Sequence, residues 1–329
     1  MEPYDKLTRL GKLRRLRKLA LKALDNYNLQ IAWVRFLTQE TNTMFYLQTT
    51  DHQKYVLRIY SNEETTLFDN QAEMFWLNAL KQDTQIKVIE PVSRWDGAYI
   101  TTAIMAGVPG EHRCALFKWV PGQALEHYLT PKYYFILGQT LARLHTHAET
   151  LNPLPAYIQP KKWDKVFYYP DEPVVYNTMA YQHLFPPERV ALMDEVIRRA
   201  NNVLENLYSD PDGQILIHGD LHYWNVHVYR GDLTIIDFED VMLGYPVQDV
   251  AITLYYGMDL EAYTALRTAF KQGYSSLRLW PVKDEAQIAT LMAARSANFI
   301  NYVARIDPNP QAFIERRCES LKEFIEAQR

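Results

Sequence analysis

Cysteine is scarce in this sequence, which has Cys114 and Cys318 as its two thiols in 329 residues. Two thiols exclude a disulfide-stapled scaffold and a cysteine-based zinc site, and they fit a reducing compartment such as the cytoplasm. The chain also lacks an apolar run near the roughly 20 residues that a membrane-spanning helix requires. We therefore expect a cytoplasmic protein with no signal peptide and no membrane partner.

An excess of basic charge is also missing from most of the chain. The formal net charge is −4: residues 1–121 hold 16 Lys and Arg against 13 Asp and Glu, whereas residues 122–329 hold 19 against 26. A nucleic-acid binder usually carries a clear basic excess, so no nucleic-acid partner is expected. The acidic second part suits a cationic or neutral small molecule better.

The strongly basic stretch is residues 6–24, which contain eight Lys and Arg. Leucines recur in it at helical spacing, which predicts an amphipathic helix. Its basic face could bind a membrane surface or nucleic acid. A helix that packs on the domain and exposes its charges to water is the simpler interpretation.

Residues 1–121 contain runs of β-branched and aromatic residues that are typical of strands. The expected strands are residues 30–37, 43–50, 54–60, 98–104 and 113–120. A three-residue turn at 51–53 predicts a hairpin, and one helix is expected at about 65–80. Pro121-Gly122 then breaks the pattern, so we place a domain boundary there.

Residues 122–329 show mostly the helical period. The expected helices are residues 131–148, 187–208, 246–257, 259–277, 283–305 and 310–328. Between the second and third of these helices lies a short strand region with a hairpin turn at residues 230–232. Residues 150–186 are rich in proline and aromatic residues without a clear period, which predicts a long ordered excursion.

The stretch from His218 to Phe238 carries the strongest chemical signal. Asp220 follows a short apolar strand, Asn225 comes five residues later, and Asp237 follows a second strand and precedes Phe238. Phosphoryl transfer from ATP needs a carboxylate that orients the acceptor hydroxyl and oxygen ligands that hold Mg²⁺ against the phosphates. A kinase catalytic loop has this spacing of Asp and Asn, with a later metal-binding Asp before Phe. The combination predicts an ATP- and Mg²⁺-dependent kinase.

Several segments together make the chain resemble the aminoglycoside phosphotransferase and choline-kinase-like family. They are HGDLHYWNV (218–226), IDFED (236–240), GYPVQDVA (244–251), LGQTLARLH (137–145) and, more faintly, KYVLRIY (54–60). The resemblance implies an α+β, two-lobed protein-kinase-like fold. Residues 1–121 would form a nucleotide-binding lobe with an antiparallel sheet, and residues 122–329 a mainly helical lobe with the catalytic loop and the acceptor site.

The resemblance also assigns roles to residues of these motifs. Asp220 becomes the catalytic base, and Asn225 and Asp237 become the metal ligands. Asp249 resembles the family's buried carboxylate that braces the catalytic loop. The implied cofactors are ATP and Mg²⁺. The implied partner is a small-molecule hydroxyl acceptor: an aminoglycoside, an amino alcohol such as choline or homoserine, or a sugar.

Further residues are expected to bind the nucleotide. Phe117 and Trp119 lie in a segment that resembles the hinge holding adenine. Arg58 stands where the family has a Lys or Arg that contacts phosphates, and Glu73 on the next helix would orient it by an ion pair. Arg keeps the charge of Lys but differs from it in geometry, so Lys54 on the same strand face is the alternative.

Glycine is absent from residues 12–96, so the sequence lacks a Gly-rich phosphate loop. Thr41 and Asn42 occupy the turn where that loop would lie, and they are expected to cover the phosphates with their side chains or amides. This departure, together with Arg58 in place of Lys, leaves open a catalytically silent ATP-binding or regulatory module.

Two further interpretations stand beside a small-molecule kinase. A protein Ser/Thr could be the acceptor of the same reaction. Alternatively, His218, Asp220, His222, His227 and Asp237 could form the metal cluster of a hydrolase, because alternating His and Asp is good ligand chemistry. That interpretation leaves the Asp-Phe pair unexplained, so the histidines near Asp220 are expected to shape the loop.

Overall fold

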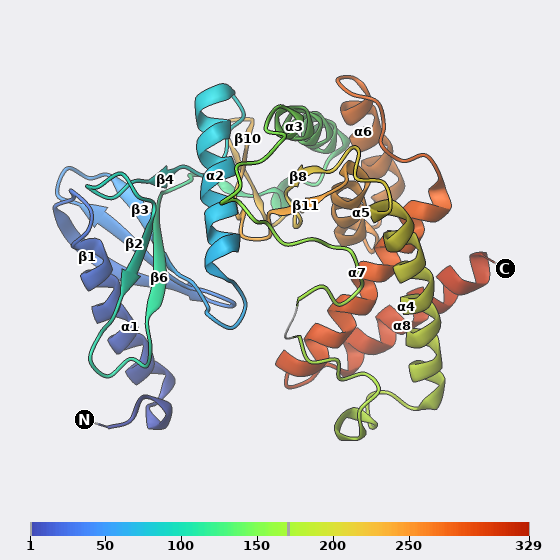
Figure 1. The fold of residues 1–329 in the computed structure, drawn as a ribbon, viewed down its shortest axis with the longest axis horizontal. Helices are drawn as coiled ribbons and strands as arrows, with labels where there is room; N and C mark the ends of the chain where they lie inside the picture. Colours follow the sequence, from blue (N-terminus) through green and yellow to red (C-terminus); the bar gives the residue numbers. More distant parts are fainter. Residues whose placement is uncertain (1, 170–171, 329) are drawn as a thin grey trace. The chain divides into compact units, whose positions relative to one another are not determined.

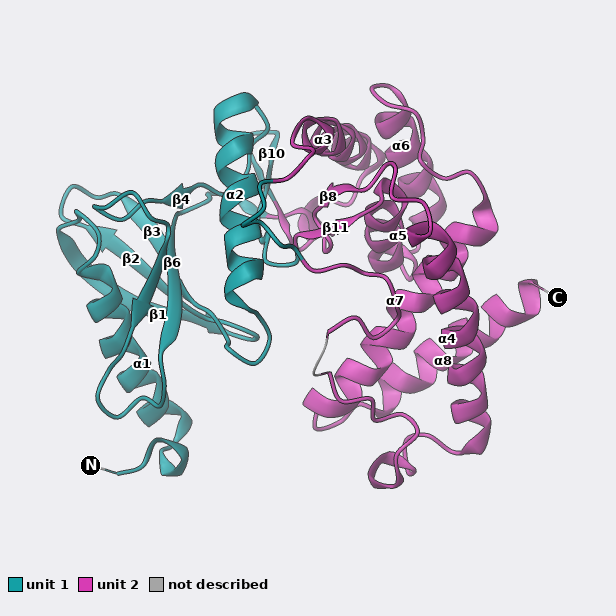
Figure 2. Ribbon diagram, viewed as in Figure 1, with its two compact units in different colours: residues 1–123, 155–160, 227–240 teal, residues 124–154, 161–226, 241–329 magenta. Residues whose placement is uncertain are grey.

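The structure, a computed structural model, describes residues 2–169 and 172–328 (Figure 1). The chain divides into two compact units, drawn in teal and magenta in Figure 2. The first comprises residues 1–123, 155–160 and 227–240; the second comprises residues 124–154, 161–226 and 241–329. The first unit therefore also contains the hairpin that precedes Asp237.

A six-stranded antiparallel sheet forms the centre of the first unit. Its strands are β1 (Ile31–Gln39), β2 (Thr43–Thr49), β3 (Lys54–Ile59), β4 (Pro91–Val92), β5 (Ile100–Ala103) and β6 (His112–Lys118). The strand order is β1-β2-β3-β6-β4, with β5 paired to β6. In this register Arg58 lies opposite Met44 on one side and Ala115 on the other, so it occupies the middle of the sheet.

Two helices of the first unit lie where the sequence predicts helices. Helix α1 (Arg9–Leu24) buries Leu16 and Leu19 in the same core cluster as Phe45 of the sheet, and most of its basic side chains lie outside that core. Helix α2 (Leu67–Asp83) begins at Thr66 with a capping box, in which the Thr66 side chain and Asp69 each accept from the other's backbone amide. Such a box satisfies amides that the first helical turn leaves unpaired.

The second unit is mainly helical, as predicted. Its helices are α3 (Pro131–Thr150), α4 (Pro187–Tyr208), α5 (Pro246–Gly257), α6 (Tyr263–Ser275), α7 (Glu285–Ile306) and α8 (Gln311–Ala327). Strand β8 (Ile215–Ile217) pairs antiparallel with β11 (Met242–Gly244). Short 3₁₀ turns lie at Tyr4–Lys6 in the first unit and at Leu125–Tyr128 and Met179–Tyr181 in the second. None of the helices described is both long enough and apolar enough to cross a membrane.

Strands β9 (Val226–Tyr229) and β10 (Asp232–Ile235) form the predicted hairpin, and the short strand β7 (Gln123–Ala124) pairs with β9. Gly122 enters β7 with a φ of 104°, and a Cβ on it would lie 2.3 Å from the carbonyl oxygen of Val228. No L side chain fits such an approach without a backbone shift. The break at Pro121-Gly122 is therefore also a point of close backbone contact.

Replacing Gly122 with alanine is expected to lower the free energy of unfolding by about 2 kcal/mol or more, because the new methyl group combines a disfavoured φ with a steric overlap. Gly231→Ala is the matched control, since Gly231 has a φ of 91° and no atom within 4 Å of a new Cβ. The control should lose only about 1 kcal/mol. Urea unfolding of both variants measures the difference, and equal losses would contradict the close approach at Gly122.

Candidate active site

The predicted catalytic loop, residues 218–225, leaves the end of strand β8 in the second unit. Its first amides are held by one buried carboxylate: the N–H groups of His218 and Gly219 donate to Asp249, each at 2.8 Å. Gly219 has a φ of 78°, in the left-handed region that glycine tolerates best. Asp249 thus braces the loop in the manner that the sequence predicts.

The brace is itself supported by a buried histidine. His145 Nε2 lies 3.1 Å from an Asp249 oxygen, and its Nδ1 lies 2.8 Å from the Tyr274 hydroxyl. All three side chains are buried. Buried polar groups are stable only when their hydrogen bonds are satisfied, so helices α3, α5 and α6 are tied together at this point. Spacing alone did not predict this role for His145.

The Asp220 carboxylate contacts four side chains. One carboxylate oxygen accepts from Arg295 at 2.7 Å and from the Tyr256 hydroxyl at 2.9 Å. The other lies 3.1 Å from His222 Nε2 and 3.1 Å from the Asn225 amide nitrogen. Each oxygen of the carboxylate therefore lies within hydrogen-bond distance of two partner groups.

These donors keep Asp220 ionised. Burial opposes its ionisation, but His222, Arg295 and Tyr256 outweigh burial and hold the pKa of Asp220 below its ordinary value. The Trp224 amide donates to His222 Nδ1 at 3.2 Å, so we assign the ring proton to Nε2, where it points at Asp220. His222 thus shapes the loop, as predicted.

In the first unit, Arg58 forms ion pairs with a carboxylate of helix α2 and with one that follows strand β10. Its guanidinium, buried in the sheet, donates to Glu73 of α2 at 2.9 Å and to Asp237 at 3.0 Å. The Tyr60 hydroxyl donates to the second Glu73 oxygen at 2.7 Å. The predicted ion pair between Arg58 and Glu73 is therefore present. Lys54, the alternative to Arg58, is exposed at the start of the strand.

A third carboxylate, Glu239, completes this cluster. It lies 3.5 Å from Arg58 and accepts a short hydrogen bond from the side chain of Asn42. Burial, only partly offset by Arg58, and the repulsion of Asp237 and Glu73 raise the pKa of Glu239 to about 8. One guanidinium thus faces three carboxyl groups.

Asn42 and Thr41 differ in their environment, although both lie in the predicted phosphate-covering turn. Asn42 is buried and also accepts from the Ser61 amide at 2.9 Å, while Thr41 is exposed at the tip of the turn. Asp237 has a φ of 62°, a left-handed conformation that few non-glycine residues adopt. Its neighbour Phe238 packs edge-to-face on Trp76 of α2, which fixes the turn after β10.

The predicted hinge segment, residues 117–119, uses two of its amides in bonds to neighbouring backbone carbonyls. The Lys118 amide donates to Glu90 and the Trp119 amide to Lys54, at 2.9 and 3.0 Å. The ring of Phe117 is buried 5.1 Å below the Arg58 guanidinium. Phe117 therefore contacts the cluster around Arg58 through its side chain. The next backbone amide along the chain after those of Lys118 and Trp119 belongs to Val120.

The predicted histidine metal cluster is not formed. Within the described part of the chain no three His, Cys, Asp or Glu side chains come together as a metal site. His218 instead accepts from the Asp220 amide at 3.3 Å, and His227 belongs to the first unit. The hydrolase interpretation was wrong because alternation along a loop does not bring these side chains to one point.

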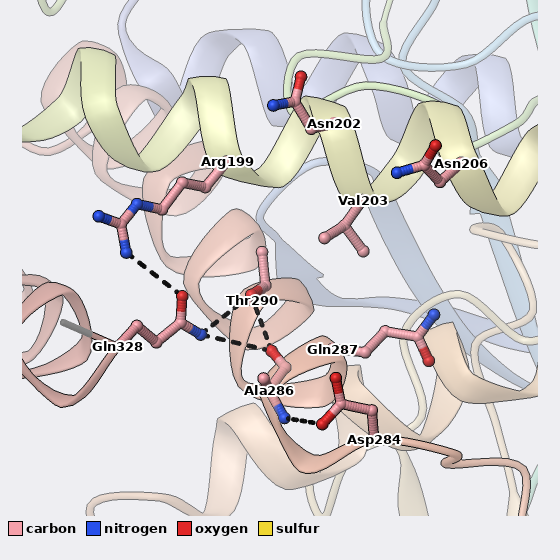
Figure 3. A pocket seen from close by; sticks show the side chains of 9 residues that line it. All are labelled: Arg199, Asn202, Val203, Asn206, Asp284, Ala286, Gln287, Thr290 and Gln328. Atoms are coloured by element: carbon pink, nitrogen blue, oxygen red, sulfur yellow. Dashed lines mark hydrogen bonds between the residues drawn. The ribbon is translucent and has the colours of Figure 1, made fainter.

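A pocket of about 420 Å³ lies elsewhere in the second unit, among α4, α7 and α8 (Figure 3). It is lined by Arg199, Asn202, Val203, Asn206, Asp284, Ala286, Gln287, Thr290 and Gln328. None of these is a predicted site residue. Side chains that sequence reasoning missed instead surround Asp220 and Arg58, namely Arg295, Tyr256 and Glu239.

This fold is that of small-molecule kinases. It superposes on the microcompartment-associated aminopropanol kinase with a TM-score of 0.79, 21% identity and coverage of 94% of this chain and 98% of that one. An amicoumacin kinase crystallised with AMP-PNP and Ca²⁺ gives a TM-score of 0.75, with 19% identity and 96% of both chains covered. These matches confirm the predicted protein-kinase-like α+β fold.

The chain belongs to the phosphotransferase enzyme family, whose model matches residues 33–286. Similar sequences include an uncharacterized protein of Synechocystis sp., 27% identical over 75% of this chain and 66% of that protein. Amicoumacin kinase of Bacillus subtilis is 23% identical over 77% of this chain and 74% of its own length. The predicted family, and with it the phosphotransferase class, is confirmed.

Replacing Asp249 with alanine is expected to cost about 3–5 kcal/mol of folding free energy, because two buried amides and His145 lose their shared acceptor. Tyr274→Phe is the milder comparison, since it removes only a hydroxyl from the far side of His145 and should cost about 1 kcal/mol. Chemical denaturation measures both. A loss for Asp249→Ala no larger than that for Tyr274→Phe would contradict the bracing role.

Proposed function

We propose that this chain transfers the γ-phosphoryl group of ATP to a hydroxyl group of a small molecule. The observation that carries the proposal is Asp220: an ionised carboxylate, five residues before Asn225, held on the catalytic loop by four donors. Phosphoryl transfer depends mainly on positioning and charge stabilisation, and this arrangement supplies a positioned acceptor for a hydroxyl proton.

Asp220 would hold the acceptor hydroxyl rather than act as a strong base. Its low pKa keeps it charged across the physiological range, so it can always accept a hydrogen bond from that hydroxyl. In a loose transition state the nucleophile loses its proton late, and orientation matters more than basicity. Phe117 and Trp119, with the Val120 amide, would bind adenine, while Arg58, oriented by Glu73, would contact the phosphates beside Thr41 and Asn42.

The charge balance around Arg58 fits a divalent cation. Glu73, Asp237 and Glu239 face one guanidinium, and burial, together with the repulsion of Asp237 and Glu73, raises the pKa of Glu239. Asp and Asn oxygens are ligands that Mg²⁺ prefers, so Asp237 and Asn225 would hold it. When bound, Mg²⁺ supplies charge neutralisation on the transferring phosphates.

The acceptor that we propose is a small, cationic alcohol. Among the proteins named above are kinases of amicoumacin and aminopropanol, and the second part of the chain is acidic. Beside Asp220 in the catalytic loop, the half-exposed Trp224 donates to Glu126 at 2.6 Å, which pairs an aromatic face with a carboxylate. Such a pair suits an ammonium group. We place the enzyme in the cytoplasm, where Cys114 and Cys318 would stay reduced.

The first test is ATP consumption with Mg²⁺ across a panel of aminopropanol, choline, homoserine, aminoglycosides, sugars and a generic protein substrate. Asp220→Asn should lower acceptor-dependent turnover by about 10²–10⁴-fold, because it removes the charge that holds the hydroxyl. Asp212→Asn, at an exposed turn, is the matched control and should leave turnover unchanged.

Each outcome of this panel is informative. Turnover with one class of acceptor, lost in Asp220→Asn, supports the proposal and names the acceptor class. Turnover with the protein substrate alone would replace the small molecule by a protein Ser/Thr. MgATP binding without any turnover would favour a silent module, and absence of nucleotide binding would overturn the kinase proposal.

Asp237→Asn is expected to weaken MgATP binding by about tenfold or more, because a proposed metal ligand loses its charge. Asp232→Asn is the matched control, since Asp232 lies on the same hairpin in an exposed ion pair with Lys87. That pair contributes little, so the control should bind like the wild type. Calorimetric titration with MgATP at several Mg²⁺ concentrations measures both affinities. Identical MgATP affinities in the two variants would contradict the assignment of Asp237 as a metal ligand.

A further inference from the structure

Arg295 of helix α7 is a buried cation next to the proposed catalytic carboxylate. Its side chain is 6% exposed, and one terminal nitrogen lies 2.7 Å from Asp220. The same nitrogen lies 3.3 Å from the Tyr256 hydroxyl, and the other terminal nitrogen lies 3.3 Å from the Tyr168 hydroxyl. The ring of Phe299, one turn further along α7, lies 4.7 Å from the guanidinium carbon.

These contacts fix the guanidinium from several directions. Phe299 packs against the plane, while Asp220 and the hydroxyls of Tyr256 and Tyr168 lie near its edge. A planar group held in this way offers its N–H donors in fixed directions, unlike a flexible ammonium. Arg295 therefore presents one donor to Asp220 in a single geometry.

The position of Asp220 depends on donors at both of its oxygens. His222 and Asn225, which contact one oxygen, lie in the catalytic loop with Asp220 and would move with it. Arg295 and Tyr256 contact the other oxygen from helices α7 and α5, which are outside the loop. Of these two residues, Arg295 forms an ion pair with Asp220, whereas Tyr256 forms a hydrogen bond through its neutral hydroxyl. Arg295 is thus the ionic link between the carboxylate and the helical framework.

We propose that Arg295 is a positioning residue for phosphoryl transfer, holding the Asp220 carboxylate in the orientation that receives the acceptor hydroxyl. The proposal rests on the proposed function of Asp220 and adds a residue that no motif in the sequence identifies. A misplacement near 1 Å at a reacting group can lower a rate by about 10²-fold. Loss of Arg295 should therefore act on the chemical step and leave nucleotide binding intact.

The test compares Arg295→Met with Arg305→Met. Arg305 lies on the same helix, stacks on Tyr302 and faces Glu172 at 3.6 Å, so its replacement also removes a partly buried cation. With an acceptor from the panel above, Arg295→Met should lower kcat by about 10²-fold while KM for ATP changes less than about threefold. Arg295→Lys, which keeps the charge but not the fixed planar donors, should recover only part of this loss. Arg305→Met should retain the wild-type kcat.

Coupling to Asp220 separates positioning from a general loss of structure. In an Asp220→Asn background, Arg295→Met should produce little further decrease in kcat, because the group that it positions has lost its function. An equal decrease in both backgrounds would overturn the proposal. So would a kcat for Arg295→Met that matches Arg305→Met, or a loss that appears in KM for ATP alone.

Two measurements keep the proposal testable if a variant or the assay fails. Should Arg295→Met not fold, Arg295→Lys is compared with Arg305→Lys, and equal kcat values overturn the proposal. Should the wild type turn over no acceptor, the proposed function fails at that step. The unfolding midpoints of Arg295→Met, Asp220→Asn and the double variant then still test the contact: non-additive shifts support it, and additive shifts refute it.

Discussion

A buried carboxylate must be satisfied by donors, and this requirement governs how the second unit is built around its catalytic loop. Asp249 has no exposure to solvent, and it accepts from two loop amides and faces His145. Without it, the sharp turn at Gly219 would leave buried amides unpaired. The motif spacing of the loop is meaningful only because this acceptor, some thirty residues later in the chain, holds the loop in one conformation.

The carboxylates of the two candidate-site regions differ in how many cationic and hydrogen-bonding groups surround them. In the second unit Asp220 is balanced by Arg295 and surrounded by donors, so its charge is stabilised by the protein alone. In the first unit Arg58 faces three carboxylates, and burial, together with the repulsion of Asp237 and Glu73, raises the pKa of Glu239. A preorganised, fully paired carboxylate suits a group that orients a substrate. A cluster with more carboxyl groups than cationic side chains, such as that around Arg58, suits the binding of a metal cation.

Much of the secondary structure and one loop of the candidate site could be predicted from the sequence, because helical periodicity and short-range spacing depend on residues that are close together in the chain. The helices at 187–208 and 246–257 were predicted with the bounds that the structure gives, and the loop from Asp220 to Asn225 came from spacing. Strands β4, β7 and β11 were missed because two or three residues cannot show a period, whereas the equally short β8 was predicted from its three consecutive apolar residues. Arg295 was equally out of reach: it contacts Asp220 from 75 residues away, and its helix alone does not reveal which side meets the loop.

Residues 12–96 contain no glycine, and the turn between β1 and β2 is held by the side chain of Asn42. A Gly-rich loop approaches phosphates through bare backbone amides, which requires conformations that glycine alone adopts readily. Here the turn between β1 and β2 is instead fixed by a buried side chain that bonds both Ser61 and Glu239. A turn pinned in this way has little freedom to fold over a ligand. Charge recognition of the phosphates would then depend on Arg58, whose fork-shaped guanidinium suits phosphate oxygens better than a lysine point charge does.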